Sequence, residues 1–195
     1  ISQSGGVNLL RNSIGWNNTD FWIPTSGAYT VQTIQNPELE SMGFGAGWYS
    51  PVGVNTHHRQ ELTLPALGTY TMNFYMKKSV YNDTYEVKHA GVDVIVDGVT
   101  VFTGLNGTTQ AATLTNGFEL FTCTFETKTS KNIIVRLNIT DSSETTVSGL
   151  MLNIGGQSLQ WSSNTSEVYN TNVRMDINGV QVMGNRDGSK TVSTP

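Results

Sequence analysis

The chain has 195 residues, enough for one medium-sized domain, and 11 Lys and Arg against 15 Asp and Glu give a formal net charge of −4. This mild acidity, without any basic cluster, excludes the electrostatic footprint of a nucleic-acid-binding protein, and no apolar run approaches the roughly 18 residues of a membrane span. The single cysteine excludes an internal disulfide framework and a Cys-rich zinc site.

The first third of the chain offers two strand candidates and one helical turn. Residues 7–11 and 28–34 are expected as strands, and residues 36–42 are the best helical candidate because Pro37 can occupy the first position of a helix. The sequence begins with Ile1 and shows no basic region followed by an apolar stretch, so we expect a segment of a longer protein rather than one with a secretion leader.

The middle of the chain alternates apolar and polar residues with a period of two, which is typical of half-buried strands. The clearest run covers residues 70–77. Cys123 falls on the apolar side of another run, so we expect a buried, unreactive thiol. Asp97-Gly98 is a two-residue hairpin signal between two such runs. The strand candidates of this region are residues 60–64, 70–77, 92–96, 99–102, 118–126, 133–140 and 147–154.

The organisation changes near residue 161. Residues 162–171 are polar and turn-like, and a short hairpin around Asn178-Gly179 follows, with another turn expected at Asp187-Gly188. We therefore predict an all-β fold, an antiparallel β-sandwich of jelly-roll type over residues 1–161, with a linker and short β-hairpin extension over residues 162–195. The extension is too small for its own core and must pack on another module.

Aromatic and amide side chains suggest a sugar-binding site. Such a site needs a flat ring for the apolar face of a pyranose and polar groups for its hydroxyls. Two loop-like stretches, one rich in glycine and one polar, supply both kinds of group, and for each ring the alternative is closure of the core. The candidate ligand-binding residues are Trp48, Tyr49, His57, Tyr81, Asn82, Asp83 and Tyr85.

The remaining ionisable residues give little support for metal binding or catalysis. His57 and His58 are neighbours whose side chains point to opposite faces of a strand, so they are not expected to hold one metal ion. Asp141 and Glu144 resemble a cation loop only loosely. Carboxylates for glycoside hydrolysis are present, but nothing fixes a pair of them, and no nucleophile elbow, zinc-protease helix or phosphate loop occurs.

Several phrases, taken in order, resemble one family. They are similar to carbohydrate-binding-module-like domains in tail, baseplate and fibre proteins of phages that infect Gram-positive bacteria, with baseplate accessory proteins of lactococcal phages as the expected nearest relatives. Such modules often hold a structural calcium beside an aspartate of the closing strand, but residues 150–154 read Leu-Met-Leu-Asn-Ile, so no metal or other cofactor is expected there. The phrases are residues 8–13 followed by Trp16 and Trp22, residues 60–77, residues 147–162 and residues 177–182.

The resemblance implies a non-catalytic adhesin in the virion tail tip or baseplate, which binds host cell-wall polysaccharide during adsorption. It also implies an oligomeric assembly with other tail or baseplate proteins, and no membrane or nucleic-acid partner. Two alternatives stay open: a structural adaptor that docks neighbouring tail proteins without binding sugar, and a polysaccharide-cleaving enzyme.

Overall fold

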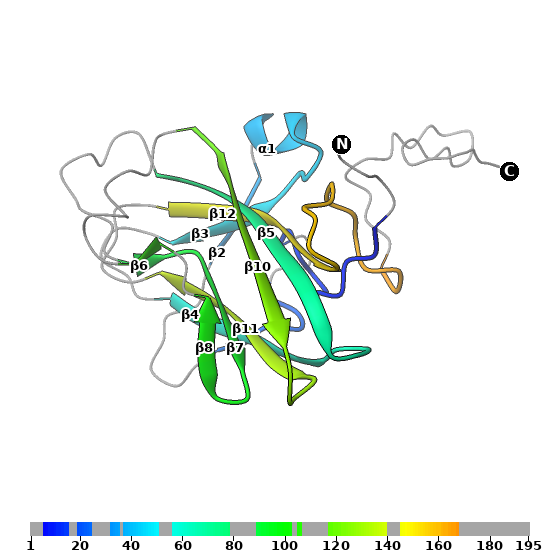
Figure 1. Ribbon diagram of the computed structural model, residues 1–195. Helices are drawn as coiled ribbons and strands as arrows, with labels where there is room; N and C mark the ends of the chain where they lie inside the picture. The colour runs from blue at the N-terminus through cyan, green and yellow to red at the C-terminus, as the bar shows by residue number, and fades with distance from the viewer. Residues whose placement is uncertain are drawn as a thin grey trace, which may run out of the picture.

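The computed structural model describes most of the predicted β-sandwich. It covers residues 6–15, 19–24, 32–35, 37–50, 56–78, 89–102, 105–106, 117–139 and 145–167. Two five-stranded sheets pack face to face, with every hydrogen-bonded strand pair antiparallel (Figure 1). The all-β sandwich expected from the alternating runs is therefore confirmed.

Sheet A and sheet B divide the long strands between them. In sheet order, sheet A consists of β1 (Ile23–Pro24), β4 (Thr56–Thr63), β11 (Asn132–Ile139), β7 (Val92–Val96) and β8 (Val99–Phe102). Sheet B consists of β10 (Glu119–Thr127), β5 (Gly68–Lys78), β12 (Thr145–Ile154), β3 (Gly47–Ser50) and β2 (Gln32–Ile34). The orders β4-β11-β7-β8 and β10-β5-β12-β3 are those of a jelly roll.

Three short elements complete the described structure. Strands β6 (His89–Ala90) and β9 (Leu105–Asn106) pair with each other, and helix α1 (Pro37–Ser41) lies at the margin of sheet B (Figure 1). Pro37 is the first residue of this helix, as the sequence suggests. No helix in the described part of the chain is long and apolar enough to cross a membrane.

The core fills the space between the two sheets. The alternation along β5 places Tyr70, Met72, Phe74 and Met76 inside, each almost completely buried. Cys123 packs half-buried against the same core, and burial raises the pKa of its thiol to about 11, so the thiol is protonated at neutral pH. The expected core-facing position of Cys123 is confirmed, with a side chain that is half-buried instead of fully buried.

The hairpin signal at Asp97-Gly98 connects β7 and β8 as predicted. Asp97 has φ of 51° and Gly98 has φ of 78°. Positive φ at both central residues is typical of a type I′ turn, whose twist matches that of the flanking strands. The turns expected at Asn178-Gly179 and Asp187-Gly188 lie outside the described residues.

The strand expected over residues 7–11 is wrong, because the segment makes one backbone bond to β12, from Leu9 to the carbonyl of Leu152 at 2.9 Å, and the side chain of Asn8 occupies the neighbouring hydrogen-bonding groups. Its Oδ1 accepts from the amide of Leu10 at 3.1 Å and from that of Leu152 at 3.1 Å, and its Nδ2 donates to the carbonyl of Leu150 at 2.8 Å. A local side-chain bond of this kind competes with a strand ladder. The segment therefore runs beside β12 as a bent chain, held by the backbone bond of Leu9 and by the side-chain amide of Asn8.

The end of the described chain returns to its beginning. Ser162 donates a hydrogen bond to the carbonyl of Gly6, and Asn164 donates to the carbonyl of Asn8 at 3.0 Å. The carboxylate of Glu167 accepts from the amide of Asn12 at 2.8 Å. Figure 1 shows these two segments, blue and orange, side by side at one side of the sandwich. The domain boundary predicted at residue 161 and the extension over residues 162–195 stay predictions.

Candidate functional site

The outer face of sheet A carries an ordered set of polar side chains. Residues that alternate with the core positions of β4, β11 and β7 point away from the core. Strand register sets them in rows: Arg59 pairs with Arg136, which pairs with Asp93, and Glu61 pairs with Ile134, which pairs with Ile95. The outward set is His57, Arg59, Glu61, Thr63, Asn132, Ile134, Arg136, Asn138, Asp93 and Ile95.

An open groove of about 410 Å³ lies over one half of this face. Its floor combines the apolar side chains of Ile95 and Ile134 with a polar border from Glu61, Thr63 and Asn132. We call it the sheet A groove. A mixed floor of this kind offers apolar contact together with hydrogen-bonding groups, which is what a sugar ring with hydroxyls at its rim requires.

The polar border of the groove is held by bonds between neighbouring side chains. Arg59 Nε lies 2.7 Å from Glu61 Oε2, and Thr63 Oγ1 donates to Asn132 Oδ1 at 2.9 Å. The first contact is exposed and therefore contributes little to stability. Its effect is positional, because it sets the direction of the Glu61 carboxylate at the border of the groove.

A buried charge cluster adjoins the groove on the same face. Asp93 is only 1% exposed, and its Oδ2 accepts from Arg136 Nη2 at 2.9 Å, from Arg136 Nε at 3.2 Å and from Asn138 Nδ2 at 2.9 Å. Three donors on one oxygen compensate the buried charge. Asp93 therefore positions Arg136 and Asn138, and its carboxylate is poorly placed to reach a substrate.

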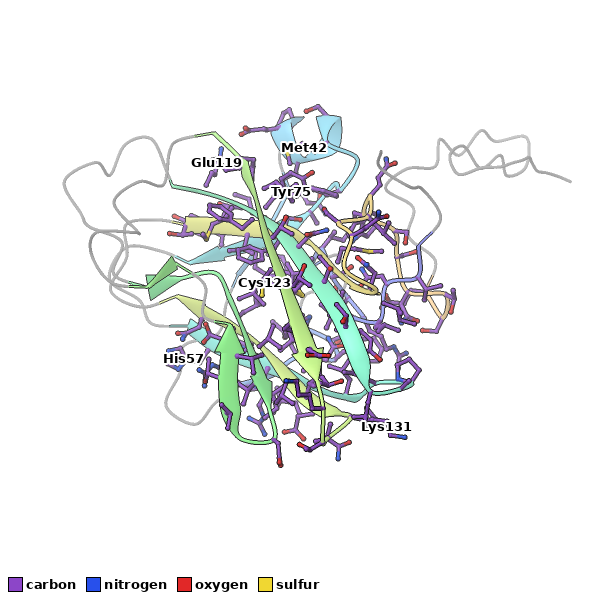
Figure 2. All side chains as sticks on the ribbon, viewed as in Figure 1. Met42, His57, Tyr75, Glu119, Cys123 and Lys131 are labelled. Atoms are coloured by element: carbon purple, nitrogen blue, oxygen red, sulfur yellow. The ribbon has the colours of Figure 1, made fainter. Side chains whose placement is uncertain are left out.

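The structure separates the predicted ligand-binding residues. His57 lies half-buried on the outer face of sheet A, in register with Asn138, at the end of the sandwich opposite Lys131 (Figure 2). Tyr49 lies half-buried on the outer face of sheet B. These two residues are therefore on opposite sides of the molecule. The other predicted residues, Tyr81, Asn82, Asp83 and Tyr85, lie outside the described residues.

Trp48 requires a correction. Its ring was expected on a sugar-binding surface, but its side chain is 0% exposed and packs edge to face against Trp22, with ring centroids 5.4 Å apart. The glycine-rich stretch around it forms strand β3, whose inward phase sends the indole into the core. Trp48 is thus a core residue and offers no surface for stacking.

Sequence reasoning missed Arg59, Arg136 and Asp93, and it counted Glu61 only among the carboxylates available for glycoside hydrolysis. The available signal was the polar phase of the same alternating runs whose apolar phase predicted the core. What the sequence does not give is the pairing, which aligns residues 43 positions apart at Arg136 and Asp93. In the described part of the chain, no group of three or more His, Cys, Asp or Glu side chains could hold a metal ion.

His58 points into the core, opposite to His57, as expected for neighbours on a strand. It is 1% exposed, and its Nδ1 has no hydrogen-bond partner among the described residues. Burial, and secondarily the charge of His57, lower its pKa below the ordinary 6.5.

We expect this buried imidazole to make folding sensitive to acid. At a pH between 6.5 and the lower pKa of the folded state, His58 is protonated in the unfolded chain but neutral in the folded chain. The free energy of unfolding should therefore fall as pH drops below 6.5, as measured by urea denaturation from pH 7.5 to 5. His58→Gln should flatten this slope, whereas His57→Gln should retain most of it because burial is the larger cause. An unchanged slope in His58→Gln would contradict the assignment.

The whole chain is similar in sequence to part of a phage protein. It is 33% identical over 222 aligned residues to a tail fiber protein of Enterococcus phage phiEF24C. The alignment includes all of this chain but only 12% of that protein, so the chain spans a small part of its relative's length. No family model matches the sequence.

Solved structures share the fold at low sequence identity. The C-terminal family 22 carbohydrate-binding module of Clostridium thermocellum Xyn10B matches with a TM-score of 0.53 at 6% identity, over 80% of this chain and 100% of the module. The enzymatically active domain of tailspike protein 4 from bacteriophage CBA120 matches with a TM-score of 0.54 at 14% identity, over 75% of this chain and 21% of that one. The sandwich is therefore that of carbohydrate-binding modules, a fold shared with part of a tailspike.

Proposed function

We propose that this chain is a non-catalytic adhesin module of a phage tail, which binds host cell-wall saccharide through the sheet A groove during adsorption. Support comes from the similarity to a phage tail fiber protein along the whole chain and from the fold of carbohydrate-binding modules. The finer prediction, a baseplate protein of a lactococcal phage, stays a prediction.

The sheet A groove is the observation that carries this proposal. Its apolar floor at Ile95 and Ile134 suits the CH face of a pyranose, while Glu61, Thr63 and Asn132 present acceptors and donors for hydroxyl groups. In the described part of the chain these groups come from paired strands, so the scaffold fixes their spacing before a ligand arrives. His57, at the other end of β4 from the groove, stays a proposed contact for a longer ligand, as do Tyr81, Asn82, Asp83 and Tyr85. Tyr49 faces the other way.

Binding by one copy should be weak, because an open groove buries only part of a ligand. A virion carries tail proteins in several copies, and linked copies convert weak binding into tight attachment through effective concentration. We therefore infer a place in the virion tail, as part of an oligomeric assembly with other tail proteins, acting at the outer face of the bacterial wall.

Asp93, Glu61 and Asp97 are the carboxylates on or beside this face, and Glu61 and Asp97 line the groove. The contacts of the first two suit binding better than bond cleavage. Asp93 is buried and accepts three hydrogen bonds on one oxygen, and Glu61 is paired with Arg59. A glycosidase needs one carboxyl group free to protonate the leaving oxygen and another free to act on the sugar ring or on a water. The fold is shared with an enzymatically active tailspike domain, so the release of reducing ends from wall polymer is the assay that decides.

One observation favours the adaptor function as a second candidate. Edge strand β8 exposes two apolar side chains, Val99 at 63% and Val101 at 40%. A strand edge that pairs with no other strand among the described residues and carries apolar side chains is a surface to which another protein can add. An adaptor of this kind would dock a tail protein along β8 and would leave the groove empty.

Glu61→Gln tests the proposed groove against a closely matched control. Glu61 and Glu126 are both strand glutamates paired with a nearby cation, with side chains 54% and 56% exposed, but Glu126 lies on β10 of the other sheet. We expect Glu61→Gln to weaken binding to purified Gram-positive cell walls about tenfold, the size of one lost charged hydrogen bond, and Glu126→Gln to leave it unchanged.

The purified cell walls used in this assay should include those of Enterococcus, the host genus of the phage relative, and of Lactococcus. Equal loss in both variants would contradict the groove as the binding site. If the unmodified chain binds none of the cell walls in the panel, the adhesin function is contradicted and the adaptor function is favoured. Reducing ends released by the unmodified chain would identify an enzyme.

A further inference from the structure

A second hollow lies on the opposite side of the molecule, on the outer face of sheet B. This sheet B cavity has a volume of about 380 Å³, within the range of ligand pockets. Five separate parts of the chain meet there, and Figure 2 shows two of the lining residues, Met42 and Tyr75, close together beneath α1. The other lining side chains used below are Phe44, Asn73, Leu120 and Trp161.

A bulge in β12 creates the aromatic wall of the cavity. The register with β5 shifts between Ser148 and Met151, and Gly149 there has φ of 66°. A Cβ at Gly149 would lie 2.5 Å from Cζ of Phe44, so only glycine lets this ring rest on the strand. Phe44 in turn contacts Tyr75 and Trp161, with ring centroids 5.3 Å and 5.6 Å apart. The half-buried rings of Tyr75 and Trp161 are therefore fixed in place.

Asn73 contributes a buried acceptor without a partner. The residue is 3% exposed, and its Nδ2 donates to Ser158 Oγ at 2.8 Å and to the carbonyl of Leu159 at 3.4 Å. Because the Leu159 carbonyl can only accept, the amide must keep its nitrogen on that side. Its Oδ1 is therefore left without a hydrogen-bond partner among the described residues. A buried carbonyl oxygen in this position is stabilised by a ligand that brings an O–H or N–H.

The cavity specifies the chemistry of its ligand. Its described lining combines aromatic and thioether side chains with the amides of Asn73 and Gln160 and the hydroxyl of Ser158, and none of these groups is charged. Such a site favours a neutral molecule with an apolar face and hydroxyl or amide hydrogens. We propose that the sheet B cavity is a second ligand-binding site for a neutral pyranose, whose hydroxyl or acetamido group donates to Asn73 Oδ1.

This second site does not depend on the function proposed for the sheet A groove. The two lie on opposite faces of the sandwich and share no lining residue. Two sites on one module would let a single copy contact two points of a polymer, or two polymers.

The test uses the full 195-residue chain and three neutral sugars, glucose, galactose and N-acetylglucosamine, followed by ¹H–¹⁵N NMR. We expect at least one sugar to shift both the indole N–H signal of Trp161, identified by its loss in Trp161→Phe, and the side-chain amide signals of Asn73. Failure of all three sugars to shift these signals at 50-fold molar excess would overturn the proposal.

Blocking variants locate the site. Leu120 borders the cavity and Leu67 lies in the turn before β5, and the two are 48% and 49% exposed, so both tolerate a polar replacement. Leu120→Arg should weaken sugar binding at least tenfold, and Leu67→Arg should change it less than twofold. Gln160→Arg, at another exposed position of the rim, should repeat the loss. Unchanged binding in both rim variants would overturn the proposal. Glu61→Gln should leave these shifts intact, which separates this site from the groove.

Discussion

Replacing Trp48 with alanine should lower the free energy of unfolding by about 3–5 kcal/mol, the usual result of removing a large buried ring. The indole is completely buried between the sheets and packs edge to face on Trp22. Its removal loses both the transfer of the ring from water and the aromatic contact, and leaves a cavity that the rigid strands β3 and β12 cannot close. Urea denaturation followed by far-UV circular dichroism measures the change.

Tyr49→Ala is the matched control because the two residues are neighbours on β3. Tyr49 lies on the outer face and is half-buried, so its replacement should cost about 1 kcal/mol. If Trp48→Ala weakened wall binding while the unfolding midpoint stayed unchanged, the indole would have to act at a surface, and the assignment to the core would be wrong.

Replacing Asn8 with alanine should destabilise the domain by a similar amount, about 3–5 kcal/mol. The side-chain amide serves the backbone amides of Leu10 and Leu152 and the carbonyls of Leu150 and Ser162, with distances from 2.8 to 3.1 Å. Most of these groups are buried, and each loses its partner without gaining water. Denaturation in urea gives the size of the loss.

Two further variants interpret that result. Asn8→Asp keeps acceptors for the two amides but loses the donors, so it should recover only part of the stability. Asn132→Ala removes an exposed asparagine that accepts one bond from Thr63, and should change stability by less than about 0.5 kcal/mol. Equal effects of Asn8→Ala and Asn132→Ala would show that the amide network contributes nothing specific.

The sequence predicted most strands because alternation is a local property. Along β5, each inward residue could be named from its neighbours alone, and the hairpin at Asp97-Gly98 followed from the need for positive φ. Residues 7–11 broke the rule because the bonds of Asn8 reach Leu150 and Leu152, which are distant in sequence. The apolar residues of this segment therefore belong to a bent chain instead of a strand.

The candidate site was harder to predict because it depends on pairing between strands. Asp93 sits between two buried valines and reads as an exposed strand residue, but Arg136 and Asn138 of β11 bury it. Trp48 was misassigned for a related reason, since its glycine-rich surroundings are typical of a loop until β2 and β12 pair with them. The sheet B cavity forms where the bulge of β12, the ring of Phe44 and residues 158–161 come together. No local sequence pattern predicts that these three distant features are neighbours.

The clasp between residues 6–12 and residues 162–167 determines how the domain would respond to tension. A force applied at Gly6 and Glu167 acts on two neighbouring segments that are joined to each other by side-chain hydrogen bonds. These hydrogen bonds carry the force first, before the backbone hydrogen bonds between the β-strands. Under such tension the clasp would be strained first, and the outer faces of sheets A and B would keep their shape.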